Sequence, residues 1–175
     1  GDVLARGRTS HESVSRFLDA HADVWGVDST SLSADPALIP MMHDPHTGLP
    51  RFTRHFYTQH AGGIPVFDTS LRLLVRTNQD NELVLAASDL RSLQGWTPPT
   101  APSRSAVNTL AQSAATRLLG PRATVSPAPR SVVFAGAGPD SMSPRLAIEV
   151  TAVRGTVGER DYAKRRLVID AGSGG

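Results

Sequence analysis

The histidines are the residues whose type and spacing could do chemistry in this sequence. His43-Asp44-Pro45-His46 places two imidazoles three positions apart with a carboxylate between them, and such groups bind zinc in proteins. The proline inside this run disfavours a helix, so the run lacks the geometry of the zinc-binding His-Glu-x-x-His helix. His11-Glu12 begins in the same way, but Ser15 stands where the second histidine would have to be. We therefore expect a solvated loop at 43–46 and no metal site in this chain.

Nucleophilic catalysis by serine is the next possibility. The sequence contains no Gly-x-Ser-x-Gly elbow. Ser173 lies between Gly172 and Gly174, and Asp170 is the only acid close to it. Neither a Walker-type phosphate loop nor a dinucleotide-binding glycine fingerprint occurs. We therefore expect no enzymatic activity, no catalytic residue and no cofactor in this chain, and we expect His21 to be a histidine at the edge of the core.

Composition excludes further classes of function. The chain has 175 residues, with 18 Lys and Arg against 16 Asp and Glu, and this near-neutral balance is not typical of nucleic-acid-binding proteins. The absence of cysteine excludes disulfides, thiol nucleophiles and cysteine-based zinc sites. No apolar run reaches membrane-spanning length. We expect neither nucleic acid nor a membrane as a partner, and one medium domain or two small ones.

Two segments have the residue spacing of an amphipathic helix. The first covers about 10–25, where Thr9 and Glu12 predict a capping box and Gly26 a stop. The second covers about 105–119 and ends before Gly120-Pro121. The expected apolar faces are Val14, Phe17, Leu18, His21, Val24 and Trp25 in the first helix, and Val107, Leu110, Ala111, Ala114 and Leu118 in the second.

Alternating apolar residues predict three strands after each helix. The expected strands are 51–60, 65–77, 82–87, 131–135, 146–153 and 162–169. Residues 28–50 are expected to be irregular, because Ser, Asp and Pro recur there. A turn is expected at 78–81, and the stretch at 95–105, which holds one glycine and three prolines, is expected to be a linker.

The order of these elements is the same in both halves of the chain. A helix followed by three antiparallel strands predicts an α+β fold with two tandem units, each a helix packed on a small antiparallel sheet. A parallel Rossmann-like sheet is disfavoured, because parallel strands need crossover helices. The units are expected at 1–94 and 106–175, joined by the linker at 95–105.

Residues 57–67 carry a resemblance to a known family. Gln59-His60-Ala61-Gly62-Gly63-Ile64-Pro65-Val66-Phe67 resembles the Gln-x-x-x-Gly-x-Pro-Val motif of the fungalysin/thermolysin propeptide (FTP) domain, and Tyr57 also fits. Residues 17–27 are similar to the opening helix of that domain. The family often has glycine in the tight turn of the next hairpin, whereas this chain has Asn78-Gln79-Asp80-Asn81, and residues 35–50 do not align well.

The second half is similar to the PepSY-type module that follows the FTP domain in such precursors. Leu146-Ala147-Ile148-Glu149-Val150 is similar to its penultimate strand. Residues 168–174 are similar to its closing Val-Asp-Ala-x-Thr-Gly motif, which places Asp170, Ala171 and Gly174 in that motif. Ile169 stands where valine is usual, and Ser173 where threonine is usual. The resemblance covers nearly the whole chain in the right order.

The resemblance implies two tandem cystatin-like units, FTP-like at 1–94 and PepSY-like at 106–175. It implies the propeptide of a secreted zinc metalloprotease of the thermolysin or the fungalysin branch. Such a propeptide is not an enzyme, and it acts as intramolecular chaperone and inhibitor of its protease until it is removed. The partner is then the cognate catalytic domain, and zinc and calcium are expected only there. The chain is expected to be secreted or periplasmic, from a bacterium.

The residues of the motifs have a physical interpretation as well. Gly63 permits a sharp reversal, Pro65 suits a first or edge position of a strand, and Gln59 could bond the free backbone groups of the corner. We therefore expect mainly structural roles for Tyr57, Gln59, Gly63, Pro65, Val66, Asp170, Ala171 and Gly174.

The end of the chain and two further functions stay open. The glycine-rich tail Gly172, Ser173, Gly174 and Gly175 is either a flexible lead into the protease cleft or a frayed terminus. A free-standing cystatin-like binding or inhibitor module, without a protease of its own, is one alternative function. A structural periplasmic or cell-surface domain is the other.

Overall fold

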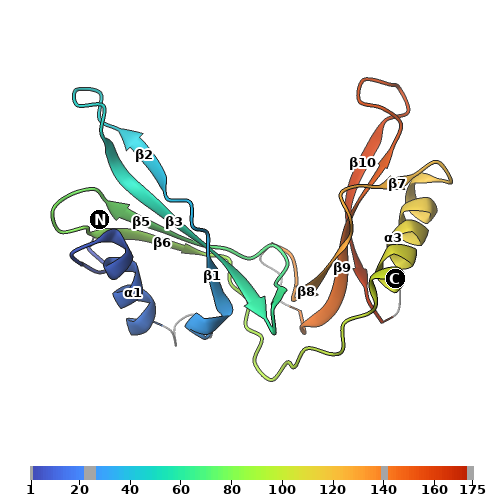
Figure 1. Ribbon diagram of the computed structural model, residues 1–175, viewed down its shortest axis with the longest axis horizontal. Helices are drawn as coiled ribbons and strands as arrows, with labels where there is room; N and C mark the ends of the chain where they lie inside the picture. Colours follow the sequence, from blue (N-terminus) through green and yellow to red (C-terminus); the bar gives the residue numbers. More distant parts are fainter. Residues whose placement is uncertain (1, 22–26, 139–141, 173–175) are drawn as a thin grey trace. The chain divides into compact units, whose positions relative to one another are not determined.

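The computed structural model describes residues 2–21, 27–138 and 142–172 (Figure 1). The chain forms two compact units. Unit 1 contains residues 1–60 and 68–94, and unit 2 contains residues 61–67 and 95–175. Each unit combines a helix with antiparallel strands, so the predicted α+β class is confirmed. The short segment 61–67 lies in unit 2, whereas we expected all of 1–94 to form one unit.

Helix α1 (Ser10–Ala20) begins with the predicted capping residues. The Thr9 hydroxyl accepts a hydrogen bond from the Glu12 backbone N–H at 3.2 Å. The Glu12 carboxylate accepts from the backbone N–H of Arg8 at 2.7 Å, one residue before the position that a capping box uses. The bond to Thr9 satisfies a donor that the first turn leaves without a partner, and the bond to Arg8 ties the residue before the cap to the helix. The expected last turn, with Val24, Trp25 and Gly26, lies outside the described residues.

The sheet of unit 1 is built around β3, and its strands occur in the order β1-β3-β5-β6, with β2 and β4 also pairing with β3. Its elements after α1 are η1 (Ser29–Ser31), β1 (Leu32–Ala34), β2 (Ile39–His43), β3 (Pro50–Ala61), β4 (Ile64–Pro65), β5 (Leu71–Arg76) and β6 (Leu83–Ser88). Two expectations were therefore wrong. The stretch 28–50 contains two short strands, which pair with β3. The single strand expected at 65–77 is two strands, because residues 66 and 67 leave this sheet to bond β8 of unit 2.

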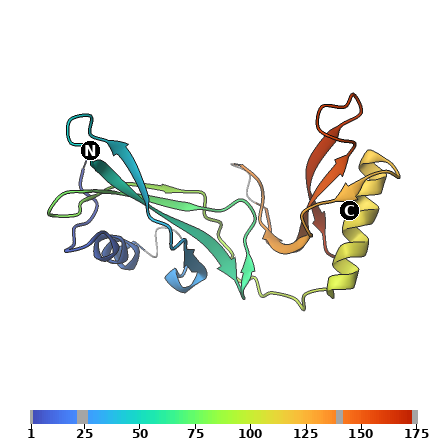
Figure 2. The ribbon, with the colours of Figure 1, turned by 45° about the horizontal axis from the view of Figure 1, so that its top comes forward.

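The core of unit 1 lies between α1 and one face of the sheet (Figures 1 and 2). Leu71, Leu73 and Val75 alternate along β5 and are buried against Val14 and Phe17 of the helix. The residues between them point to the opposite face, as the period of two along a strand requires. The alternation that predicted this strand is therefore the alternation between core and surface.

The turn between β5 and β6 places an asparagine at a left-handed backbone position. Asn81 has a φ of 43°, in the left-handed region that asparagine tolerates better than most residues. Its side-chain amide donates to the carbonyl of Arg8 at 3.0 Å. Its own carbonyl accepts from the buried Ser13 hydroxyl at 2.5 Å. The turn is thus bonded both to α1 and to the segment before it, which supports the unusual backbone angle.

Unit 2 packs one helix on a small antiparallel sheet (Figures 1 and 2). Ser103 caps α3 (Arg104–Leu119) by accepting from the backbone N–H of Ala106 at 3.2 Å. The strands pair with the central β9, with β10 on one side of it and β7 and β8 on the other. They are β7 (Thr124–Val125), β8 (Arg130–Phe134), β9 (Arg145–Arg154) and β10 (Ala163–Asp170).

The buried face of α3 differs from the expected one at its last turn. Val107, Ala111 and Ala114 are buried against β9 and β10, as predicted. Leu118, however, is 54% exposed, and Leu119 is buried in its place. A helix has 3.6 residues per turn, so its contact face shifts along its length. Here Leu119 follows Ala115 by four positions and packs beside it.

Two neighbouring leucines test the assignment of the faces in unit 1. Leu73→Ala should lower the free energy of unfolding by about 2–5 kcal/mol, because it leaves a cavity among buried side chains. Leu74→Ala removes the same atoms from the opposite, partly exposed face and should cost about 1 kcal/mol. Urea unfolding followed by circular dichroism measures both. Equal losses would contradict this assignment.

Candidate functional site

Gln59, in the motif at residues 57–67, is buried and bonded through both ends of its amide. It is 1% exposed, near the end of β3. Its Nε2 donates to the carbonyl of Arg91 at 2.7 Å, and its Oε1 accepts from the Arg91 backbone N–H at 2.9 Å. We expected Gln59 to bond the corner that directly follows it, and that was wrong. Its amide instead holds a loop residue 32 positions later in the chain, a partner that the local sequence does not indicate.

Tyr57 lies on the same face of β3 as Gln59. It is opposite Leu71 in the antiparallel register and packs against the core of unit 1. Burial raises the pKa of its phenol. Tyr57 therefore contributes to the core of unit 1.

The two glycines after β3 form the hairpin turn of the motif. Gly62 has a φ of 55° and Gly63 a φ of 78°, the pair of positive angles that a two-residue turn of type I′ requires. A side chain at Gly63 would meet no atom within 4 Å. A Cβ at Gly62 would lie 2.7 Å from the ring carbon Cγ of Pro98. Gly62 is thus constrained by backbone and by packing, and sequence reasoning on Gly63 alone missed it.

Val66 and Phe67, the two residues after β4, bond the sheet of unit 2. Val66 forms a parallel bridge with Val133, and the Phe67 backbone N–H donates to the Val133 carbonyl at 2.8 Å. The Phe67 ring packs on Val132 and Ala147. Pro65 directly precedes this bridge, as the second residue of the two-residue strand β4. The motif therefore ends in a buried attachment to β8, which its sequence does not predict.

A carboxylate and two guanidinium groups lie on the face of unit 2 that is opposite to α3. Glu149 on β9 accepts from Arg130 Nε at 2.7 Å and from Arg166 Nε at 2.6 Å. Burial alone would raise the pKa of Glu149, but the hydrogen bonds and charges of these two arginines lower it overall. The Arg166 guanidinium also lies 4.4 Å from the centre of the Phe67 ring. Sequence analysis did not find this cluster, because its members meet only through the register of three strands.

The closing motif ends β10 with a fixed turn. Asp170 Oδ1 accepts from the backbone N–H of Gly172 at 2.9 Å, and Asp170 lies 3.6 Å from Arg145 in an ion pair. The Ala171 backbone N–H donates to the carbonyl of Leu146 at 3.1 Å. Asp170 and Ala171 thus have structural contacts. Ser173, Gly174 and Gly175 lie outside the described residues.

β10 is an edge strand, and its backbone groups can be assigned to one side or the other. The bond from Ala171 to Leu146 marks one bonded pair of the antiparallel ladder with β9. Bonded and non-bonded pairs alternate, so the N–H and C=O groups of residues 164, 166 and 168 point away from β9. No strand of the described ranges pairs with that outer edge.

An apolar groove runs beside this edge, between α3 and β10. It encloses about 340 Å³ and is lined by Ala114, Leu118, Leu167 and Ile169, with Arg117 and Arg166 also in its wall. A strand edge next to such a groove can accept an extended segment of another protein as an additional strand, whose side chains then enter the groove.

The carboxylate of the His43–His46 run has other partners. The Asp44 carboxylate accepts from the backbone N–H groups of His46 and Thr47 and from the Arg51 guanidinium, and the Arg51 hydrogen bond is the main cause that lowers its pKa.

His21, as predicted, is a half-buried residue at the edge of the core, and its ring stacks on Phe17. Within the described ranges, no three His, Cys, Asp or Glu side chains come together as a metal site, and no helix is long and apolar enough to span a membrane.

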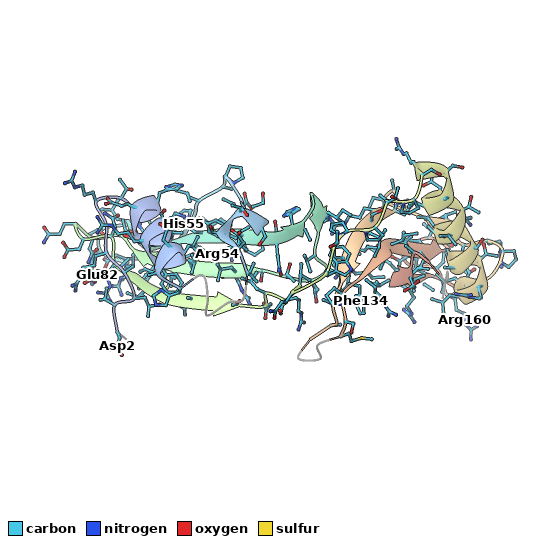
Figure 3. The ribbon with its side chains drawn as sticks, turned by 90° about the horizontal axis from the view of Figure 1, so that it is seen from below. Asp2, Arg54, His55, Glu82, Phe134 and Arg160 are labelled. Atoms are coloured by element: carbon cyan, nitrogen blue, oxygen red, sulfur yellow. The ribbon has the colours of Figure 1, made fainter. Side chains whose placement is uncertain are left out.

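One buried histidine lies under α1. His55 on β3 is 3% exposed and its Nε2 has no hydrogen-bond partner among the described residues (Figure 3). The ring of His11, on the helix, meets it edge-on at 4.9 Å. Burial, with a smaller contribution from the charge of His11, lowers the pKa of His55. The residue is therefore neutral in the native unit near pH 7.

Comparisons with known proteins do not assign the chain to a family. A scan against models of protein families found no match, and a search of curated proteins found no significant one.

The amide of Gln59 gives a test of the motif's structural role. Gln59→Ala should lower the free energy of unfolding by about 2–4 kcal/mol, because it removes both hydrogen bonds to the backbone of Arg91 and opens a cavity. Gln79→Ala, in the exposed turn after β5, is the matched control and should change it by about 0.5 kcal/mol or less. Urea unfolding again provides the measurement. A loss no larger than that of the control would contradict the role of Gln59.

His55 predicts a pH dependence of stability. Its folded-state pKa lies below the ordinary value, so the unfolded chain binds the proton more readily. Stability should therefore fall as pH drops below about 6.5, by at most about 1.4 kcal/mol per pH unit. Thermal unfolding at pH 7.5 and 5.5 measures this loss. His55→Phe should remove part of it and the exposed control His43→Asn none, whereas an unchanged loss in His55→Phe would assign the effect to other groups.

Proposed function

We propose that this chain is the non-catalytic propeptide of a secreted zinc metalloprotease, folded as two tandem cystatin-like units. It assists the folding of the protease domain and inhibits that domain until it is cleaved off. The proposal rests on the resemblance of residues 59–66 and 168–174 to the FTP and PepSY motifs. The motif residues that the structure describes form turns and strand attachments.

The observation that carries this proposal is the anchored end of β10. Asp170 and Ala171 hold the last described turn to the sheet through the bonds to Gly172 and Leu146. A segment that inhibits by entering a cleft gains affinity when its base is held in place, because less conformational freedom is lost on binding. The turn is thus the fixed base of the segment that, in this proposal, enters the cleft towards the catalytic zinc of the protease.

The outer edge of β10 supports the same proposal. An extended segment of the protease domain can pair with the backbone groups of residues 164, 166 and 168 and place apolar side chains in the groove beside Leu118. This pairing and the tail would act together, since both begin from the same strand. Zinc and calcium belong to the protease domain in this proposal.

The chaperone role follows from the same contacts. A propeptide that binds the native protease more tightly than its unfolded or partly folded forms stabilises the native state by mass action. It also covers apolar surface that would otherwise aggregate during folding. One binding surface therefore serves both functions, and a change that weakens inhibition should weaken the rescue of folding as well.

The experiment mixes this chain with the mature metalloprotease from its own precursor. We expect inhibition of peptide hydrolysis and a higher refolding yield of the denatured protease. Val168→Pro should weaken both effects, because it removes a backbone N–H that points away from β9 and leaves the ladder within the sheet intact. Val168→Ala, which keeps the N–H, is the matched control. Circular dichroism of both variants checks that unit 2 is folded.

The outcomes separate the proposal from its alternative. Inhibition by the wild type and by Val168→Ala, with a loss in Val168→Pro, supports the propeptide and places the protease on β10. Equal inhibition by all three proteins would remove the edge of β10 from the account. Neither inhibition nor rescue by the wild type would contradict the proposal and favour a free-standing binding module.

A further inference from the structure

The sheet of unit 1 has a second face that α1 does not cover. The strand pairings place its side chains in rows across the sheet, one of which runs Ile39, Arg54, Leu74, Leu85. We call this surface the open face. Its members are Ile39, Met41, Phe52, Arg54, Phe56, Arg72, Leu74, Arg76, Leu85 and Ala87.

Much of the open face is apolar, and part of that apolar surface is accessible. Leu85 is 46% exposed and Ile39 is 37% exposed, at opposite ends of the row that contains Arg54. Neither helix of the described residues packs on this face, because α1 packs on the other face of this sheet and α3 on the sheet of unit 2. Contiguous apolar surface of this kind marks sites of interaction with other proteins.

The charges of the open face are all positive. Its strand positions carry three arginines and no acidic residue. Arg72 is paired with Asp89 at 2.7 Å, and Arg76 is paired with Glu82. Among the described residues, Arg54 has no carboxylate partner, and its buried Nε has no hydrogen-bond partner at all.

The apolar neighbours of Arg54 favour its binding of a carboxylate from a partner. Its cross-strand neighbours are Ile39 and Leu74, and Phe52 and Phe56 precede and follow it on the same side of β3. A guanidinium surrounded by apolar side chains has lost part of its hydration already in the free protein. A carboxylate brought by a partner would therefore pair with it at a smaller additional desolvation cost than at an exposed arginine.

We propose that the open face binds a protein surface that presents a carboxylate surrounded by apolar side chains, and that Arg54 takes this carboxylate. The inference rests on the proposed function, which makes the protease domain the partner. It adds a second contact surface, on unit 1, with a defined chemistry. The apolar rim formed by Ile39 and Leu85 excludes water from the ion pair, as the surroundings of energetically dominant interface residues do.

The test measures the dissociation constant of the full chain with the mature protease from its own precursor, inactivated at its catalytic residue. Calorimetry should show binding about 30-fold weaker for Arg54→Met, which keeps an apolar stem and loses the charge. Leu85→Glu replaces an exposed side chain and should also weaken binding, because it places a carboxylate where the partner's own is expected. Arg104→Met, at the exposed first position of α3, is the control and should bind within about twofold of the wild type.

Three results distinguish the two proposals. Weaker binding by both open-face variants, with unchanged melting temperatures, supports the docking surface. Wild-type affinity in Arg54→Met and Leu85→Glu, while the wild type binds tightly, would overturn the docking surface and leave the propeptide function in place. Absence of binding by the wild type would overturn both.

Discussion

The pairing between the Gln59 amide and the backbone of Arg91 is the constraint on which the path of the chain depends. One side chain satisfies both the donor and the acceptor of a residue that belongs to no helix or strand. Directly after Gln59 the chain turns through two glycines and places Phe67 in the sheet of unit 2. Soon after Arg91 it enters unit 2 again. Both passages from unit 1 to unit 2 therefore begin within a few residues, along the chain, of the two partners of this pairing.

One face of each sheet carries arginines, and the two faces differ, within the described residues, in whether every arginine has a carboxylate partner. The proposed binding role of the open face depends on this difference. On the face of unit 2 that is opposite to α3, three guanidinium groups have carboxylate partners: Glu149 lies between Arg130 and Arg166, and Asp170 lies beside Arg145. That face is closed by internal pairs and by the ring of Phe67. In unit 1, Arg54 occupies an apolar row without such a partner among the described residues. The face of unit 2 whose arginines are paired suits a structural role. The face of unit 1 on which Arg54 lacks a carboxylate in the described part of the chain suits a binding role.

Local sequence patterns predicted those helices and strands whose signals come from residues close together in the sequence. The alternation at residues 71–75 indicated a half-buried strand, and Thr9 with Glu12 indicated the start of α1, because these signals need only neighbouring residues. The short strands β1 and β2 were missed, since pairing with β3 stabilises them and their own residues are mostly exposed. The partner of Gln59, the cluster around Glu149 and the exchange of Leu118 for Leu119 depend on register and packing between distant segments. Residue propensity and local spacing do not encode such contacts between distant segments.

The central claim is that this chain binds a protease through the edge and the end of β10. Amide hydrogen exchange, measured with and without the inactivated mature metalloprotease, tests it most directly. The account predicts slower exchange at residues 164, 166 and 168, whose N–H groups point away from β9, and at Gly172 beside the anchored turn. Exchange at these amides that is unchanged by a saturating amount of the protease would contradict it.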